Sequence, residues 1–175
     1  EAIQSGIVLA PEDRKQHGLI LEMSVRENAS LPRLRVDQKA GAINFGAEIA
    51  LAADMVEKID VKTPGLEQVV QYLSGGNQQK IVLGKWLAMK PRLLLLDEPT
   101  RGIDVGSKQE IYRLMEELAA TGVAILFVSS EMEEVLGMAD RALVMHEGVI
   151  TGELARDQLS EEAVMQLATG NKAAA

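Results

Sequence analysis

The stretch Leu93-Leu-Leu-Leu-Asp97-Glu98-Pro99-Thr100 decides the fold class of this 175-residue chain. Four consecutive leucines are typical of a strand buried on both faces of a parallel sheet, and two carboxylates follow where that strand ends. In open α/β sheets, ligands bind beyond the carboxyl ends of the strands. Asp97 can therefore hold Mg²⁺, which prefers oxygen ligands, and Glu98 can polarise an attacking water. The alternative is an acidic strand-to-turn junction ended by Pro99, and this run alone leaves both open.

Around this stretch, two sequence periodicities alternate. Three further apolar runs predict buried strands: Gly6–Ala10, Val123–Val128 and Arg141–Met145. Within Ser107–Ala120, apolar residues recur at the i, i+3, i+4 and i+7 spacing of one helix face. Strands that alternate with helices predict βαβ crossovers and a mostly parallel α/β sheet. A final hairpin is expected where Glu147-Gly148 separates Leu143–His146 from Val149–Leu154.

The residues from about 24 to 89 break this alternation. Apolar residues in Ala47–Ile59 and Ile81–Met89 have helical spacing. Ser24-Val25-Arg26-Glu27 has the pattern of a capping box, in which serine and glutamate side chains satisfy backbone N–H groups at a helix start. We therefore expect an all-helical insertion here. The tail Lys172–Ala175 is expected to be frayed.

Composition excludes several classes of function. The chain has 18 Lys and Arg against 26 Asp and Glu, a net charge of −8, which argues against a nucleic-acid-binding role. It has no cysteine, so disulfides and thiolate metal sites are excluded. The longest apolar run, Val123–Val128, is far shorter than the ~20 residues that span a bilayer. His17 and His146 fit a loop and a hairpin better than a metal site.

A second informative run is Leu73-Ser74-Gly75-Gly76-Asn77-Gln78-Gln79-Lys80, which precedes an apolar helical pattern. A serine and two glycines at a helix start leave backbone N–H groups available where the helix dipole is positive. Such a start can bind an anion such as phosphate. The alternative is an ordinary N-cap with a flexible Gly-Gly turn.

Taken together, the two runs carry a family resemblance. LSGG-x-QQK and, twelve residues later, LLLLDEPT-RGID closely resemble the signature motif, Walker B strand and D-loop of ABC-type ATPases. Gly6–Lys15 resembles the strand and Q-loop, Met23–Asn28 the start of the helical subdomain, and Phe127–Glu131 the switch region. More narrowly, PEDRK, DEPTRGIDVG and VSSEMEEVLGMADR resemble the C-terminal half of double-cassette ATPases of ribose-, xylose- and galactose-type importers.

The resemblance implies a fold and a set of roles. The fold is a P-loop NTPase-like ABC ATPase domain with a helical subdomain at about 23–90 and a RecA-like core portion, 1–22 plus about 91–175. The cofactors are ATP and Mg²⁺. The metal-binding residue is Asp97, and Glu98 orients the hydrolytic water. The signature residues that bind the γ-phosphate of a nucleotide on the opposite cassette are Ser74, Gly75, Gly76 and Gln78.

Other positions carry two readings each. Gly102 and Asp104 correspond to the D-loop at the interface between cassettes, and Asp104 can also cap the following helix. Gln79 and Lys80 either support the signature helix or are simply solvated.

Two positions depart from the family pattern. The glutamine usual in the Q-loop is Glu12, and the switch histidine is replaced by Ser130. A serine cannot act as a possible cation toward the γ-phosphate, and Ser130-Glu131-Met132-Glu133 also has the pattern of a capping box. We therefore hypothesise that the site built on this cassette hydrolyses ATP slowly or not at all, while its signature motif completes the site of a partner cassette.

The phosphate-binding loop G-x-x-x-x-G-K-[ST] does not occur in the 175 residues. In the family this loop and its strand would precede Glu1, so we expect a cassette truncated before Glu1. Because the backbone amides and lysine of that loop hold the phosphates, the chain is expected to be inactive alone.

The leading interpretation is an energy-coupling ATPase portion of a sugar importer, peripheral to the cytoplasmic face of the inner membrane. Its expected partners are a second ABC cassette, sugar permease membrane subunits and, indirectly, a periplasmic or extracellular sugar-binding protein, with no nucleic acid. An alternative is the ATPase of a soluble nucleic-acid or ribosome machine, which the negative charge disfavours. A third is a non-catalytic regulatory remnant.

Overall fold

The computed structural model describes residues 1–38 and 41–170. Contacts between residues divide the chain into two compact units, Glu1–Val128 and Ser129–Ala175, and each is described by itself. The tail Lys172–Ala175 lies outside the described residues.

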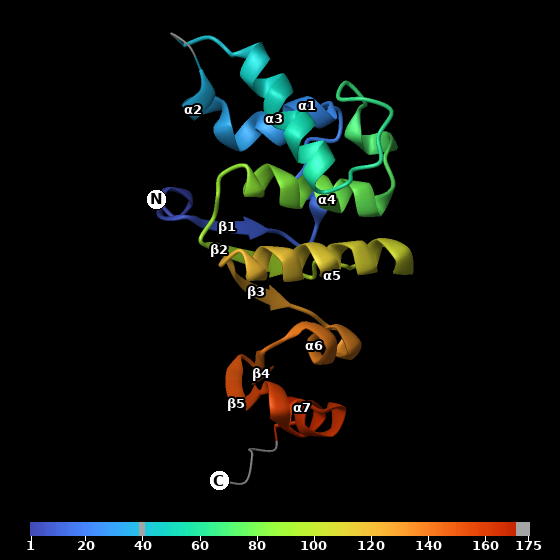
Figure 1. Ribbon diagram of the computed structural model, residues 1–175. Helices are drawn as coiled ribbons and strands as arrows, with labels where there is room; N and C mark the ends of the chain where they lie inside the picture. Colours follow the sequence, from blue (N-terminus) through green and yellow to red (C-terminus); the bar gives the residue numbers. More distant parts are fainter. Residues whose placement is uncertain (39–40, 171–175) are drawn as a thin grey trace. The chain divides into compact units, whose positions relative to one another are not determined.

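A three-stranded parallel sheet forms the base of the first unit (Figure 1). Its strands are β1 (Ile7–Ala10), β2 (Leu93–Asp97) and β3 (Ala124–Val128), in that spatial order. Ala10 is in register with Leu96, and Asp97 with Val128. The positions of the strands predicted in this unit are confirmed, each within one residue of its expected bounds, but the expectation that 123–128 is buried is wrong, because no residue of β3 is buried. The leucine-rich strand is central, so its carboxyl end opens between two neighbouring strands.

The expectation that β2 is buried on both faces is wrong. Leu94 and Leu96 are buried, but Leu93 and Leu95 are only half-buried. On the same side of the sheet, four apolar residues of the flanking strands are exposed: Ile7, Leu9, Leu126 and Val128. Side chains alternate between the two faces of a strand, and the helices α4 (Gly75–Leu87) and α5 (Val105–Ala120) pack against β1 and β3. Within the first unit, the sheet therefore has one face covered by helices and one open face.

The expected helical insertion lies between β1 and β2 in the chain. It contains α1 (Val25–Ser30), α2 (Leu34–Asp37), α3 (Phe45–Lys58) and α4, with short helical turns at Arg14–Gly18, Leu31–Arg33 and Val70–Tyr72. A further short turn, Ile3–Ser5, precedes β1. Helices α3 and α4 approach so closely that a Cβ on Gly84 would lie 2.5 Å from Met55 Cγ.

The start of α1 forms the predicted capping box. Ser24 Oγ accepts a hydrogen bond from the Glu27 backbone N–H at 3.2 Å, and the Ser24 N–H donates to Glu27 Oε2 at 2.8 Å. In the same first turn, Arg26 pairs with the buried Glu48 of α3 and donates from Nε to Glu67 Oε1 at 2.7 Å. Glu48 also accepts from Ser30 Oγ at 2.7 Å. These contacts fix α1 against α3.

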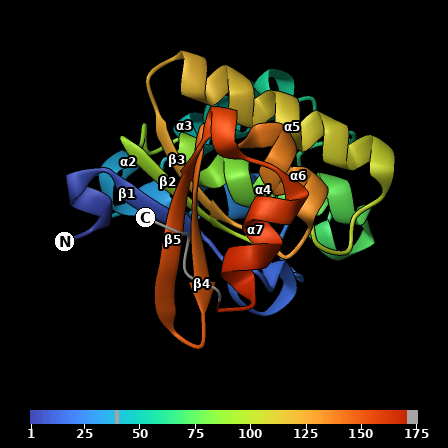
Figure 2. The same cartoon turned by 90° about the horizontal axis from the view of Figure 1, so that it is seen from below.

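The second unit contains a hairpin and two helices. Its elements are α6 (Met132–Met138), β4 (Arg141–His146), β5 (Val149–Ala155), a helical turn Arg156–Gln158 and α7 (Glu161–Ala168). The predicted turn is confirmed: Glu147 and Gly148 both have positive φ, 47° and 80°, as a tight hairpin turn requires. Figure 2 shows α7 beside the hairpin, where Leu167 packs with Val144 and Leu154.

The predicted capping box at Ser130 is wrong. Helix α6 begins one residue later than that pattern requires, so its N-cap is Glu131, whose side chain makes no capping hydrogen bond. The Glu131 N–H instead donates to Ser129 Oγ at 3.0 Å. The Ser129 hydroxyl thus bonds the turn into the helix, and the N-cap is Glu131 rather than Ser130.

Candidate functional site

The carboxyl end of β2 carries the two acidic residues that the sequence indicated. Asp97 is the last residue of the strand and is half-buried. Glu98 leaves the sheet with φ of +47°, in the left-handed region that non-glycine residues rarely adopt. Its backbone N–H donates to the Val128 carbonyl at 2.9 Å, and this hydrogen bond fixes the direction in which the chain leaves β2. Both carboxylates therefore start from a backbone position held by the sheet.

The donor set at this edge fits a magnesium ion shared with a nucleotide. Among residues 1–38 and 41–170, no group of three or more His, Cys, Asp or Glu could hold a metal ion alone. Mg²⁺ in nucleotide sites is held by one or two carboxylates, with water and phosphate oxygens completing the octahedron. Asp97 would supply the carboxylate, and the remaining ligands would come from water and the nucleotide.

Helix α4 begins with the signature run. Its N-cap is Ser74, whose Oγ accepts from the Asn77 N–H at 3.4 Å and from Asn77 Nδ2 at 2.9 Å. The first backbone N–H groups of a helix have no acceptor within that helix. Those of Gly75 and Gly76 can therefore donate to an anion, and the helix dipole favours negative charge there.

The two glycines bring α4 against the segment that joins β2 to α5. A Cβ on Gly75 would lie 3.4 Å from the Gly102 carbonyl oxygen and 2.7 Å from Arg14 Nη2. A Cβ on Gly76 would overlap the side chain of Ser107. At Gly76 only glycine permits this approach, whereas at Gly75 the close neighbour is the end of the flexible Arg14 side chain. The signature residues and the predicted D-loop residue Gly102 are thus neighbours within one unit.

Asp104 caps α5, as its second reading predicted. Its Oδ1 accepts from the Ser107 N–H at 3.0 Å and its Oδ2 from Ser107 Oγ at 2.8 Å. These hydrogen bonds, the backbone one first, lower the pKa of the Asp104 carboxyl below its ordinary value. Its role at an interface between cassettes remains a prediction.

The side chains of Gln78 and Glu12 have partners within the unit. Gln78 is buried, and its Nε2 donates to the Val70 carbonyl at 3.0 Å. Glu12 forms an ion pair with Arg101, in the loop that follows β2. The negative charge that Glu12 adds at the Q-loop position is therefore paired with a cation of the D-loop segment.

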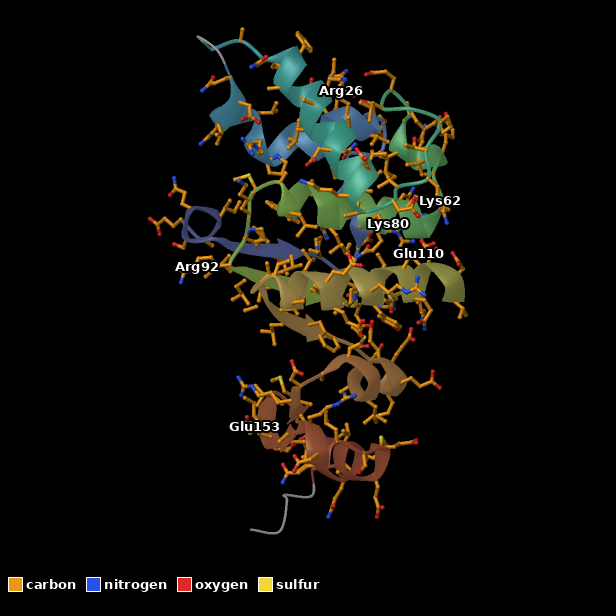
Figure 3. The ribbon with its side chains drawn as sticks, in the orientation of Figure 1. Arg26, Lys62, Lys80, Arg92, Glu110 and Glu153 are labelled. Atoms are coloured by element: carbon orange, nitrogen blue, oxygen red, sulfur yellow. The ribbon has the colours of Figure 1, made fainter. Side chains whose placement is uncertain are left out.

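Lys80 belongs to a network that ties three segments together (Figure 3). Its ammonium donates to the Asp60 carbonyl at 2.7 Å and pairs with Glu110 Oε2 of α5 at 2.9 Å, while Lys62 Nζ lies 3.0 Å from the other carboxylate oxygen. Lys80 and Gln79 are each only 3% exposed, so the reading of these two as solvated residues is wrong. Lys80 supports the signature helix.

One residue of this site was missed by the sequence reasoning. Arg14, in the turn after β1, donates to main-chain carbonyls of Arg101 and Gly102. The PEDRK pattern that contains it was noted only as part of a resemblance. Ser130 belongs to the second unit and is exposed in the turn before α6.

The sequence comparisons identify the family. A model of the family described as "ABC transporter" matches residues 2–101. The chain belongs to the ABC transporter family. It is 53% identical over 173 residues to the ribose import ATP-binding protein RbsA 1 of Streptomyces coelicolor, covering 99% of this chain and 34% of that protein. It is 51% identical to the xylose import ATP-binding protein XylG of Geobacillus kaustophilus, covering 98% and 34%. This ABC chain thus spans about a third of the length of the curated relatives it matches.

Solved structures confirm the fold class. A dimeric ATP-binding cassette bound to ADP and Pi matches with a TM-score of 0.72 and 21% identity, over 87% of this chain and 64% of that one. A nucleotide-free cassette of an ABC transporter matches with a TM-score of 0.74 and 22% identity, over 96% and 66%. The fold is that of an α/β ABC ATPase cassette. Within the described ranges of this ABC chain, no helix is both long and apolar enough to cross a bilayer.

Proposed function

We propose that this chain is part of the ATP-hydrolysing cassette of an ABC importer for a monosaccharide, within the second, C-terminal cassette of a double-cassette ATPase. The observation that carries the proposal is the placement of two motifs in one unit. Asp97 and Glu98 stand at the carboxyl end of β2, and α4 begins with Gly75-Gly76 against the segment that follows β2. Relatives named as ribose and xylose import ATP-binding proteins support the choice of sugar import.

The proposed roles follow from the chemistry of each position. ATP supplies the phosphoanhydride bond, and Asp97 holds its Mg²⁺. Glu98 orients the attacking water, since a carboxylate at hydrogen-bond distance can accept a proton from it. Ser74, Gly75 and Gly76 donate to the γ-phosphate of a nucleotide on the opposite cassette. Gln78 acts indirectly, because its side chain donates to the Val70 carbonyl and so holds the turn that precedes α4.

The 175-residue chain by itself is expected not to hydrolyse ATP, because it contains no G-x-x-x-x-G-K-[ST] loop. The test is phosphate release by the purified chain, with its Glu98→Gln variant as control. Equal, background rates in the two preparations support the proposal. A rate for the unmodified chain clearly above the variant contradicts it.

The site built on this cassette is proposed to hydrolyse slowly, since Glu12 and Ser130 replace the usual glutamine and histidine. In the intact protein, Glu98→Gln should then reduce sugar uptake less than the matching substitution in the other cassette. Uptake of labelled ribose and xylose by vesicles checks this. An equal or larger loss from Glu98→Gln overturns the proposed asymmetry.

The proposed partners are a second cassette, permease membrane subunits that contact the helical subdomain at about 23–90, and indirectly a sugar-binding protein. The proposed location is the cytoplasmic face of the membrane. Co-purification of the intact protein with its permease after mild detergent extraction tests both. Recovery with ribosomes or DNA instead would favour the soluble-machine alternative, which the net charge of −8 opposes.

A further inference from the structure

We propose that Arg14 is a positioning residue that holds the D-loop segment 101–102 against the start of the signature helix α4. The inference rests on the proposed function, because the segments it aligns are those proposed to act on ATP. Arg14 lies in the turn after β1, far along the chain from the two segments that it joins.

The guanidinium of Arg14 contacts both segments at once. Its Nη1 donates to the Arg101 carbonyl at 3.0 Å and its Nη2 to the Gly102 carbonyl at 3.3 Å. Its Nε lies 3.5 Å from Gln78 Oε1, on α4. A planar guanidinium with donors in a fixed fork can span such acceptors, whereas a lysine ammonium is a single point of charge.

The turn from which Arg14 extends is itself anchored to α4. Asp13 caps the turn by accepting from two of its backbone N–H groups, at 2.9 and 3.0 Å. At its other end, a Cβ on Gly18 would lie 3.0 Å from Val82 Cγ2, and Lys85 donates to the Gly18 carbonyl. Gln78, Val82 and Lys85 recur every three to four residues and so lie on one face of α4.

The contacts on the D-loop side depend on the path of the backbone. Arg14 binds carbonyl oxygens there, so it stays bonded only while residues 101–102 keep their present course. Glu12 adds a second connection through its ion pair with Arg101. The guanidinium also lies against Gly75, where a Cβ would be 2.7 Å from Nη2. Arg14 therefore fills the space between the signature glycine and the D-loop.

The test uses the intact ATPase that contains this sequence, assembled with its permease. The variants are Arg14→Met, which keeps the aliphatic stem, and Arg14→Lys, which keeps the charge but not the fork. The matched control is Lys15→Met, an exposed cation in the same turn. We measure kcat and KM for ATP, and hydrogen exchange of peptides covering residues 1–128, with the segment 98–104 compared against the rest.

Arg14→Met is expected to lower kcat about tenfold, the order of loss caused by modest misalignment of reacting groups. KM for ATP should change less than about twofold, since Arg14 does not touch the nucleotide in this assignment. Exchange should rise in residues 98–104 and not elsewhere. Arg14→Lys should also lower kcat, by about threefold to tenfold, because one ammonium cannot hold both carbonyls. Lys15→Met should match the wild type.

Three results overturn the proposal. One is an unchanged kcat in both Arg14 variants, and another is a raised KM at unchanged kcat, which would make Arg14 a nucleotide contact. The third is faster exchange throughout residues 1–128, which would indicate general loss of stability. If the wild-type protein shows no hydrolysis, the proposed function fails. Local exchange in Arg14→Met then still supports the positioning contact.

Discussion

At the scale of single residues, Gly76 decides whether α4 and α5 can meet. Its hypothetical Cβ would overlap the Ser107 side chain, so an added methyl group must displace one helix start. We expect Gly76→Ala to lower the free energy of unfolding by about 1–3 kcal/mol, the usual cost of overpacking. Urea denaturation followed by circular dichroism measures it. The control is Gly137→Ala in α6, where a Cβ meets nothing within 4 Å. Equal stability of the two variants would contradict the packing argument.

Single-residue predictions succeeded where the partner is close in sequence. The caps at Ser24 and Asp104 each involve a residue three positions ahead, so local spacing was enough to find them. The cap predicted at Ser130 failed because α6 begins one residue later than the pattern requires, which the spacing of Ser130 and Glu133 does not reveal. Arg14 was missed because its acceptors are main-chain carbonyls 87 and 88 residues later, which no side-chain pattern reveals.

At the scale of elements, Lys80 joins the signature helix to α5. Its side chain is 4% exposed and pairs with Glu110, whereas Lys58 and Asp54 form an exposed pair within α3. We expect Lys80→Met to lower the free energy of unfolding by about 1–3 kcal/mol, the value of hydrogen bonds to charged groups. Lys58→Met should show no measurable loss, since exposed pairs contribute little. Thermal denaturation at pH 7 compares them, and equal losses would contradict the assignment.

The same pair predicts a dependence of stability on pH. Lys80 first, then Lys62, lowers the pKa of the Glu110 carboxyl below its ordinary value of 4.5. A carboxyl with a lowered pKa in the folded state stabilises it above pH 4.5, and this contribution is lost as pH falls through the folded-state pKa. As pH falls from 6 through the folded-state pKa of Glu110, the free energy of unfolding of Lys80→Met should therefore decrease less than that of the wild type. A parallel loss in the two proteins would contradict this.

The positions of the helices and strands along the chain were predicted well, but the burial of the strands was not. The apolar pattern of 81–89 identified only the second half of α4, because its first half is polar and is recognised by the Ser-Gly-Gly start. The leucine run correctly indicated β2, yet burial on both faces depends on how many helices cover the sheet. That number is a property of tertiary packing, which a strand's own residues do not determine.

At the scale of the whole molecule, we expect the open face of the sheet to promote self-association of the isolated chain. Leu9, Leu126 and Val128 are each at least half exposed on it, and contiguous apolar patches promote association. We expect the Leu9→Thr/Leu126→Thr variant to show less self-association at unchanged thermal stability, because threonine keeps strand propensity. Sedimentation velocity measures it. Val149→Thr, an exposed site on the hairpin, is the control, and equal reduction there would contradict the prediction.

The fold class and family were accessible from sequence because two motifs at a fixed spacing carry both. The division between Val128 and Ser129 was not foreseen, since β3 runs directly into the next unit without a Gly- or Pro-rich linker. The boundaries proposed for the helical subdomain, about 23–90, remain a prediction.

The left-handed backbone conformation at Glu98 constrains which residues can evolve at this position. A φ of +47° suits glycine or asparagine better than glutamate. Glu98→Gly or Glu98→Asn would therefore relieve a backbone strain of about 1 kcal/mol at this position. The same mutants would lose the carboxylate proposed for hydrolysis. Thermal stability and ATP hydrolysis thus favour different residues at this position. A glutamate kept here despite the strain indicates selection for hydrolysis.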